Sequence, residues 1–145
     1  MLSTMLLWMG LAQAATFDGA PMDVDALSDQ AAQVVVGEVR ATRAVAGGPG
    51  IETVAEIRVT ETLLGAPSPV VTVRIPGGEL DGVVLTVPGA PRLTVGEQVV
   101  LFMDDNDQIV GFNQGAFHTQ GGMVWSMNPE IGLVLPMDEL RSTLR

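Results

Sequence analysis

The sequence contains no cysteine, no lysine and no tyrosine, and His118 is its single histidine. Without cysteine, the chain forms no disulfide, no Cys-ligated zinc site and no lipid-modified N-terminal cysteine. One histidine cannot supply the several imidazoles of a catalytic zinc site. Without lysine, Schiff-base chemistry and the phosphate-binding lysine of a P-loop are excluded. The sequence therefore predicts a domain without a cofactor, stabilised by burial and strand pairing.

Positive charge is also scarce, because the formal net charge is −10 and all seven basic side chains are arginines. A chain of this charge repels phosphate backbones, which disfavours binding to nucleic acid. The simplest interpretation of the charge is that it maintains solubility. Aromatic residues make up only 4% of the chain, which disfavours the aromatic-lined cleft of a glycosidase.

Residues 1–14 have the features of a signal peptide. They carry no charged side chain, contain the apolar run Met5–Leu11 and end in Ala12-Gln13-Ala14, whose small residues suit signal peptidase. The run is too short to span a bilayer. No basic residue precedes it, so two alternatives stay open: a start upstream of Met1, or a buried N-terminal helix. The sequence predicts a secreted or periplasmic protein with no transmembrane segment after cleavage.

Seventeen glycines and nine prolines separate short aliphatic runs, a pattern typical of an all-β chain. Two long strands are expected within Gln33–Gly65, joined by the turn Gly47–Gly50. Apolar and polar side chains alternate over 35–42 and again over 55–60, which supports both strands. Gly37 within the first strand predicts a bulge or bend of the kind that lets a strand coil into a small barrel.

Further strands and two short helices are expected after and around this ribbon. The expected strands are Val70–Ile75, Leu80–Val87, Val99–Met103 with Ile109–Phe112 as its hairpin partner, and a last hairpin of Gly115–Thr119 with Met123–Met127. The helices are expected at Asp25–Gln33, with Asp25 or Ser28 as N-cap, and at Pro136–Arg145. Val99–Met103 lacks polar alternation, which predicts a strand covered on both faces.

These elements predict a mainly all-β fold: a small OB-like five-stranded barrel with an extra C-terminal hairpin and short helices. The expected organisation is a signal peptide at 1–14, an N-terminal segment with a short helix at 15–33, a β-barrel domain at 34–127 and a C-terminal tail with a short helix at 128–145.

The order VVVGEV, a glycine-rich turn, TVAEIRVTETLLG, VVTVRI, a gap and LTVGEQVVLFM resembles a netrin-like domain, the OB-fold module of the tissue inhibitors of metalloproteinases. It is also similar to uncharacterised secreted bacterial proteins that carry Gly-Gly after the third strand and a QG-x-F near the end, here Gln114–Phe117. The resemblance implies an OB fold over Val34–Phe117. The inhibitory mechanism does not carry over, because the N-terminal cysteine that binds the protease zinc in that family has no counterpart here.

The polar face of the second and third strands is the expected contact surface. OB barrels bind their ligands on this face or through adjoining loops. We therefore expect a protein or cell-envelope partner to contact Glu56, Arg58, Thr60, Thr72 and Arg74.

The acidic turn at 104–107 is a weaker candidate site. Asp104, Asp105 and Asp107 offer the carboxylate oxygens that Ca²⁺ prefers, although their spacing does not match an EF-hand. Asp and Asn also form turns without any metal. A calcium site and a plain turn both stay open.

A hydrolase would need two carboxylates that flank its substrate, for which Glu56, Glu61, Glu79 and Asp81 are available. His118 has no Gly-x-Ser-x-Gly elbow to accompany it and is interpreted as a surface or strand-end residue. The first prediction is therefore an exported, non-enzymatic binding domain. A carboxylate-dependent hydrolase and an accessory structural module of a larger secreted enzyme are the alternatives.

Overall fold

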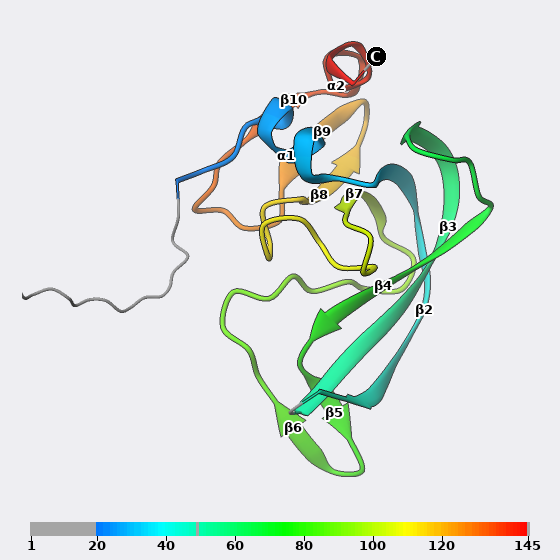
Figure 1. The fold of residues 1–145 in the computed structure, drawn as a ribbon, viewed down its shortest axis with the longest axis vertical. Helices are drawn as coiled ribbons and strands as arrows, with labels where there is room; N and C mark the ends of the chain where they lie inside the picture. The colour runs from blue at the N-terminus through cyan, green and yellow to red at the C-terminus, as the bar shows by residue number, and fades with distance from the viewer. Residues whose placement is uncertain (1–19, 49, 145) are drawn as a thin grey trace, which may run out of the picture.

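The computed structural model describes residues 20–48 and 50–144, so the expected signal peptide at 1–14 lies outside the described residues. The fold is mainly β: a seven-stranded antiparallel sheet, a separate two-stranded hairpin and two short helices (Figure 1). A closed barrel is not detected among these residues, and the finer expectation of an OB-like five-stranded barrel stays a prediction. Within the described ranges, no helix is long and apolar enough to cross a membrane.

The long ribbon consists of β2 (Gln33–Gly47) and β3 (Gly50–Leu64), as the sequence predicts. The two strands pair antiparallel along their whole length, and their register shifts beside Gly37. A Cβ atom at Gly37 would lie 2.5 Å from the Arg58 carbonyl oxygen and 2.7 Å from Ile57 Cγ2. Only glycine therefore fits where β3 approaches, and the predicted bulge is confirmed.

Gly37→Ala is expected to lower the free energy of unfolding by about 1–3 kcal/mol, because the new methyl group overpacks the ribbon against backbone atoms that cannot move aside. Chemical denaturation measures this change. Gly121→Asn is the control, since Gly121 has a positive φ of 62° that asparagine tolerates and open space around its Cα. An unfolding free energy that is equal for wild type and Gly37→Ala would contradict the close approach.

Strands add to both edges of the ribbon. On one edge β4 (Val70–Pro76) pairs with β3, and on the other β7 (Gln98–Met103) pairs with β2. The sheet then continues through β8 (Ala116–Gln120), β9 (Met123–Ser126) and β10 (Val134–Pro136). The expected last hairpin is confirmed as β8 and β9, whereas β10 was not predicted because three residues give too short a periodic signal.

Two of the expected strands were wrong. Leu80–Val87 is not one strand but the hairpin of β5 (Gly78–Leu80) and β6 (Val83–Leu85), because Asp81 and Gly82 both have positive φ and form a type I′ turn. Ile109–Phe112 does not form a hairpin partner for β7, because the chain turns again after a single bridge between Met103 and Ile109. Ile109–Phe112 therefore adds no strand of its own to the seven-stranded sheet of the described residues.

The core lies on both faces of the sheet, in two clusters of buried side chains. β7 contributes to both, since Val100 and Phe102 belong to one cluster while Val99, Leu101 and Met103 belong to the other. All five side chains are fully buried. The prediction of a strand covered on both faces is confirmed.

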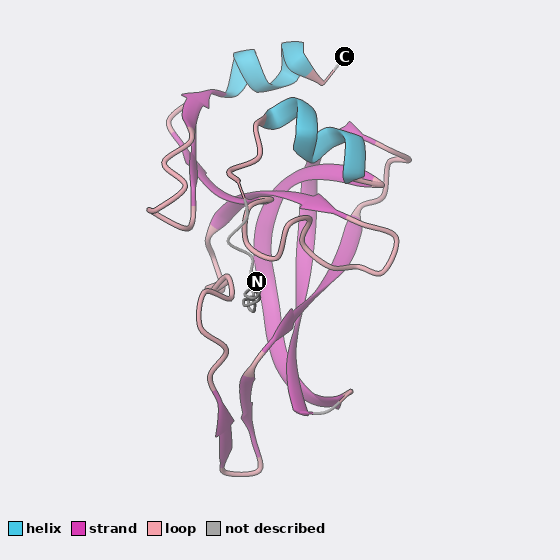
Figure 2. Ribbon diagram, turned by 60° about the vertical axis from the view of Figure 1, so that its left-hand side comes forward, coloured by secondary structure: helices cyan, strands magenta, loops and turns pink. Residues whose placement is uncertain are grey.

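The two helices lie at one end of the molecule, as Figures 1 and 2 show, and pack on one of the two core clusters. They are α1 (Val24–Gln30) and α2 (Met137–Thr143), which bury Leu27 and Leu140 respectively. The N-cap of α1 is Asp23 and not Asp25 or Ser28, because the Asp23 carboxylate accepts a hydrogen bond from the Ala26 N–H at 2.9 Å.

Candidate functional site

The predicted contact face of β3 and β4 carries two arginines that neighbouring carboxylates already bind. Arg58 lies 2.6 Å from Glu38, and Arg74 lies 3.0 Å from Glu52. These surface pairs leave little net charge for a partner to recognise. The structure does place all the predicted residues on these two strands: Glu56, Arg58 and Thr60 on β3, and Thr72 and Arg74 on β4.

The other three predicted residues of this face are Glu56, Thr60 and Thr72. Thr60 donates its hydroxyl hydrogen to the Val36 carbonyl at 3.1 Å, so this group is occupied within the ribbon. Glu56 lies directly opposite Thr72 in the β3–β4 register. The face is polar and carries two ion pairs, and it stays a prediction as a contact surface.

The carboxylates considered for a hydrolase lie on separate elements. Glu56 and Glu61 are five positions apart on β3, about 16 Å along an extended strand. Glu61 is held by Arg141 of α2 through distances of 2.8 and 2.9 Å, and this hydrogen bond raises the pKa of the Arg141 guanidinium above its ordinary value. Glu79 and Asp81 are exposed on the β5–β6 hairpin. None of the four lines the two hollows described below.

The acidic turn is organised by its own backbone. Asp104 Oδ1 accepts hydrogen bonds from the N–H groups of Asn106 at 2.8 Å and Gln108 at 3.1 Å, which is the turn-forming role of aspartate. Asp105 and Asp107 are exposed. In residues 20–48 and 50–144, no three acidic or histidine side chains come close enough together to hold a metal ion.

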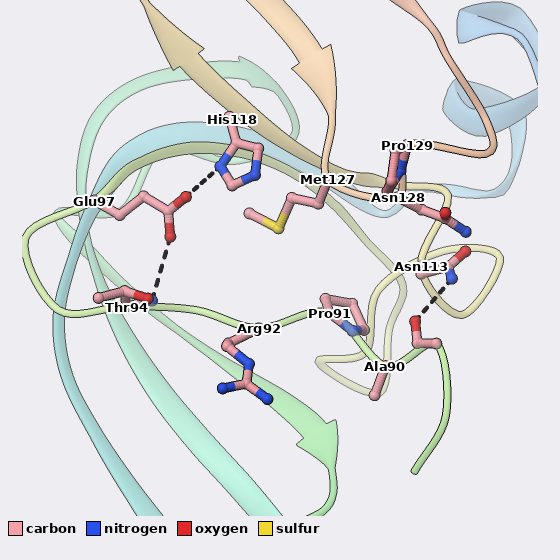
Figure 3. Close-up of a pocket in the computed structure, with 11 residues that line it drawn as sticks. Ala90, Pro91, Arg92, Thr94, Glu97, Asn113, His118, Met127, Asn128 and Pro129 are labelled. Atoms are coloured by element: carbon pink, nitrogen blue, oxygen red, sulfur yellow. Dashed lines mark hydrogen bonds and ion pairs between the residues drawn. The ribbon is translucent and has the colours of Figure 1, made fainter. Parts of the chain in front are cut away.

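Glu97 and His118 form an unpredicted pair. The Glu97 carboxylate contacts His118 Nδ1 with one oxygen and accepts the Thr94 N–H with the other at 3.2 Å (Figure 3). A carboxylate at Nδ1 holds a proton on that nitrogen, so in the neutral ring Nε2 is left as a hydrogen-bond acceptor. The pair therefore presents an oriented imidazole nitrogen on the side away from Glu97.

Two hollows adjoin this pair. The His118 pocket, of about 700 Å³, is lined by Pro91, Arg92, Asn113, His118, Met127 and Asn128, among others (Figure 3). The Trp125 groove, of about 350 Å³, is lined by Glu97, Gln98, His118, Thr119, Gln120 and Trp125, together with a glycine. Asn113 donates to the Gly89 carbonyl at 2.8 Å and so fixes the loop that borders the first hollow.

Strand pairing explains why the sequence did not reveal the pair. Val99 lies opposite His118 in the β7–β8 register, so Glu97, two residues before Val99, reaches the same ring. The sequence interpretation paired β7 with Ile109–Phe112 and left His118 without a neighbour. Predicting the β7–β8 pairing correctly would have placed Glu97 beside His118.

The β5–β6 hairpin is the second region that the sequence analysis missed. Val83 and Val84 are 62% and 64% exposed, and Leu85 is 38% exposed. Three consecutive large apolar side chains at the surface mark an interaction site more often than a lone exposed residue does. Figure 2 shows the hairpin at the end of the molecule opposite the helices.

No family model, curated protein or solved structure matches this chain. The netrin-like resemblance therefore stays a prediction, and the function has to be argued from the hairpin, the Glu97–His118 pair and the adjoining hollows.

Proposed function

We propose that this protein is an exported, non-enzymatic binding domain that holds a protein partner through its β5–β6 hairpin. The observation that carries the proposal is the run of exposed apolar side chains at Val83, Val84 and Leu85. Among the described residues, the hairpin pairs with no other strand, so an edge of β6 is open. The leader-like residues 1–14 support export to the periplasm or the medium.

The open edge of β6 has the geometry that a partner strand needs. Leu80 and Val83 flank the two-residue turn and face each other in the register, which makes them the hydrogen-bonded pair. The next pair, Glu79 and Val84, therefore turns its N–H and C=O groups outward. Val84 thus combines an exposed apolar side chain with outward backbone groups, the combination used in strand addition.

The hairpin is fixed to the ribbon at its base. The Gly77 N–H donates to the Ile51 carbonyl at 2.8 Å, and the Thr53 hydroxyl donates to the Gly77 carbonyl at 2.7 Å. A Cβ atom at Gly78 would lie 2.7 Å from Thr53 Oγ1, so the two segments are in close contact. A hairpin anchored in this way presents its edge with little loss of conformational entropy on binding.

Charge selects the kind of partner. Glu79 and Asp81 form no ion pair within the described part of the chain, and the protein carries a net charge of −10. Pairing two copies through this edge would bring four such carboxylates together, which opposes self-association. We therefore propose a different protein, with an extended segment that alternates apolar and basic side chains.

The finer fold that we propose is a partly open, OB-like barrel. Its support is the segment after β7, where Gln108 forms a parallel bridge with Arg74 of β4 and Ile109 forms an antiparallel bridge with Met103 of β7. The Arg74 N–H also donates to the Asp107 carbonyl at 2.8 Å. These contacts run from β4 back towards β7, the direction in which an OB barrel closes.

Site-specific photocrosslinking tests the proposed partner surface. Three variants each carry one photoreactive residue: at Val84, at Thr72 on the predicted β4 face, or at exposed Ser142 as the control. Each variant is incubated with periplasmic extract or culture supernatant. The proposal expects one discrete protein adduct from Val84 alone. An adduct from Thr72 instead would favour the β3–β4 face, and the absence of any adduct from Val84 would contradict the proposal.

A hydrolase is the second candidate, and the Glu97–His118 pair is the observation that favours it. An imidazole held by a carboxylate is suited to accept a proton from water, and general-base catalysis contributes about 10²–10⁴-fold to a rate. The non-enzymatic proposal instead expects wild type and His118→Gln to hydrolyse p-nitrophenyl acetate at equal rates. A rate for wild type about 100-fold or more above that of the variant would put the hydrolase first.

A further inference from the structure

The Trp125 groove combines an aromatic surface with an unpaired side-chain amide, beyond the hairpin site. Trp125 is half-buried and lies between its cross-strand neighbours His118 on β8 and Val134 on β10. Its ring centroid is 5.6 Å from that of His118, at an interplanar angle of 37°. A tryptophan held on a sheet in this way offers a rigid apolar surface at low entropic cost.

The polar groups around Trp125 are suited to hydroxyl groups. The side-chain amide of Gln120 lies on the same sheet face as Trp125 and has no hydrogen-bond partner among the described residues. This amide offers two donors and one acceptor oxygen. A ligand hydroxyl, which both donates and accepts, matches this amide.

The charge of the groove excludes acidic ligands. Glu97 contributes a carboxylate, and no arginine from the described residues lines this groove. A phosphate, sulfate or carboxylate on the ligand would meet no cation there, and the net charge of −10 would repel it. The ligand is therefore neutral or basic.

We infer that the Trp125 groove binds a neutral or amino-sugar saccharide of the cell envelope. A pyranose ring stacks its C–H face on Trp125, and its hydroxyls exchange hydrogen bonds with the amide of Gln120. The volume of about 350 Å³ falls at the small end of ligand sites, which fits a short saccharide. The carboxylate of Glu97 lines the same groove, so it favours an amino group on the sugar over an acidic group.

Tryptophan fluorescence provides a direct binding assay. Trp8 and Trp125 are the only tryptophans, so in the full chain with Trp8→Phe the emission reports on the groove alone. The probes are chitotriose, the glucosamine trimer and the galacturonate trimer. We expect a saturable change in emission with the first two, and an affinity at least tenfold lower for the galacturonate trimer.

Two variants locate the bound saccharide. Isothermal titration of the two binding trimers is expected to show affinity at least tenfold lower for Trp125→Ala and about threefold to tenfold lower for exposed Gln120→Ala, which does not disturb the core. Met123→Ala, on the same strand but outside the groove lining, is the matched control and keeps the wild-type affinity. Circular dichroism verifies that each variant is folded.

Three results would overturn the inference: no saturable binding of either sugar, equal affinity of wild type and Gln120→Ala, or tighter binding of the galacturonate trimer. The test is independent of the protein partner, because Val84→Pro alters the hairpin and leaves the groove intact. An unchanged saccharide affinity in Val84→Pro, with partner affinity lowered about 30-fold or more, would separate the two sites.

Discussion

Replacing Val84 by proline is expected to weaken binding of the protein partner by about 30-fold or more, the loss typical of a central interface residue. Proline removes the outward N–H of Val84 and the apolar side chain in one step, while an edge strand tolerates its fixed φ. The folded state should survive, because Val84 is 64% exposed and contributes little to the core. The partner that crosslinking identifies is isolated and titrated against wild type and against Val84→Pro. The ratio of the two dissociation constants measures the loss of affinity.

Two companion variants separate the backbone contribution from the side-chain contribution. Val84→Ser keeps the N–H and removes only the apolar surface, so we expect a smaller loss of about threefold to tenfold, that is, about 0.7–1.4 kcal/mol. Val95→Ser alters an equally exposed valine, 58% accessible, in a different loop and should leave the affinity unchanged. Equal affinities for Val84→Pro and wild type would exclude strand addition at β6.

Phe102→Ala is expected to lower the free energy of unfolding by about 3–5 kcal/mol. Phe102 is fully buried, and its ring centroid lies 5.7 Å from that of Phe117. Removing the ring leaves a cavity beneath the helices and ends this aromatic contact. A loss of this size is a large part of the about 5–15 kcal/mol by which domains are usually stable.

Urea denaturation followed by Trp125 fluorescence, in the Trp8→Phe background, measures this loss. Val134→Ala provides the comparison, since Val134 is largely exposed and should change stability by less than about 0.5 kcal/mol. A change below about 1 kcal/mol for Phe102→Ala would show that β7 is not the centre of the core.

The sequence predicted the parts of the fold that periodicity and backbone chemistry determine. The β2–β3 ribbon, the bulge at Gly37 and the doubly covered strand β7 each follow from alternation, from the absence of a side chain or from an unbroken apolar run. The β5–β6 hairpin was missed because the strong turn signal Asp81-Gly82 stands inside a run that is otherwise apolar. Whether the barrel closes could not be predicted from the sequence, because it depends on isolated bridges of Gln108 and Ile109 to distant strands.

Candidate sites were harder to predict than strands, because they depend on register. Glu97 and His118 are 21 positions apart, and only the β7–β8 pairing brings them together. The predicted arginines Arg58 and Arg74 were located on the expected face, but their carboxylate partners on neighbouring strands could not be read from local sequence. Val84 is exposed because no strand covers it, and a local sequence pattern does not predict whether a strand is covered.

Amide hydrogen exchange at Val84, with and without the isolated partner, tests the central claim most directly. In the free protein the outward N–H of Val84 has no backbone partner on its open side, so fast exchange is expected. Strand addition at β6 predicts that exchange at Val84 slows at least tenfold when the partner binds. Unchanged exchange at Val84, with protection appearing on β3 or β4 instead, would contradict the account.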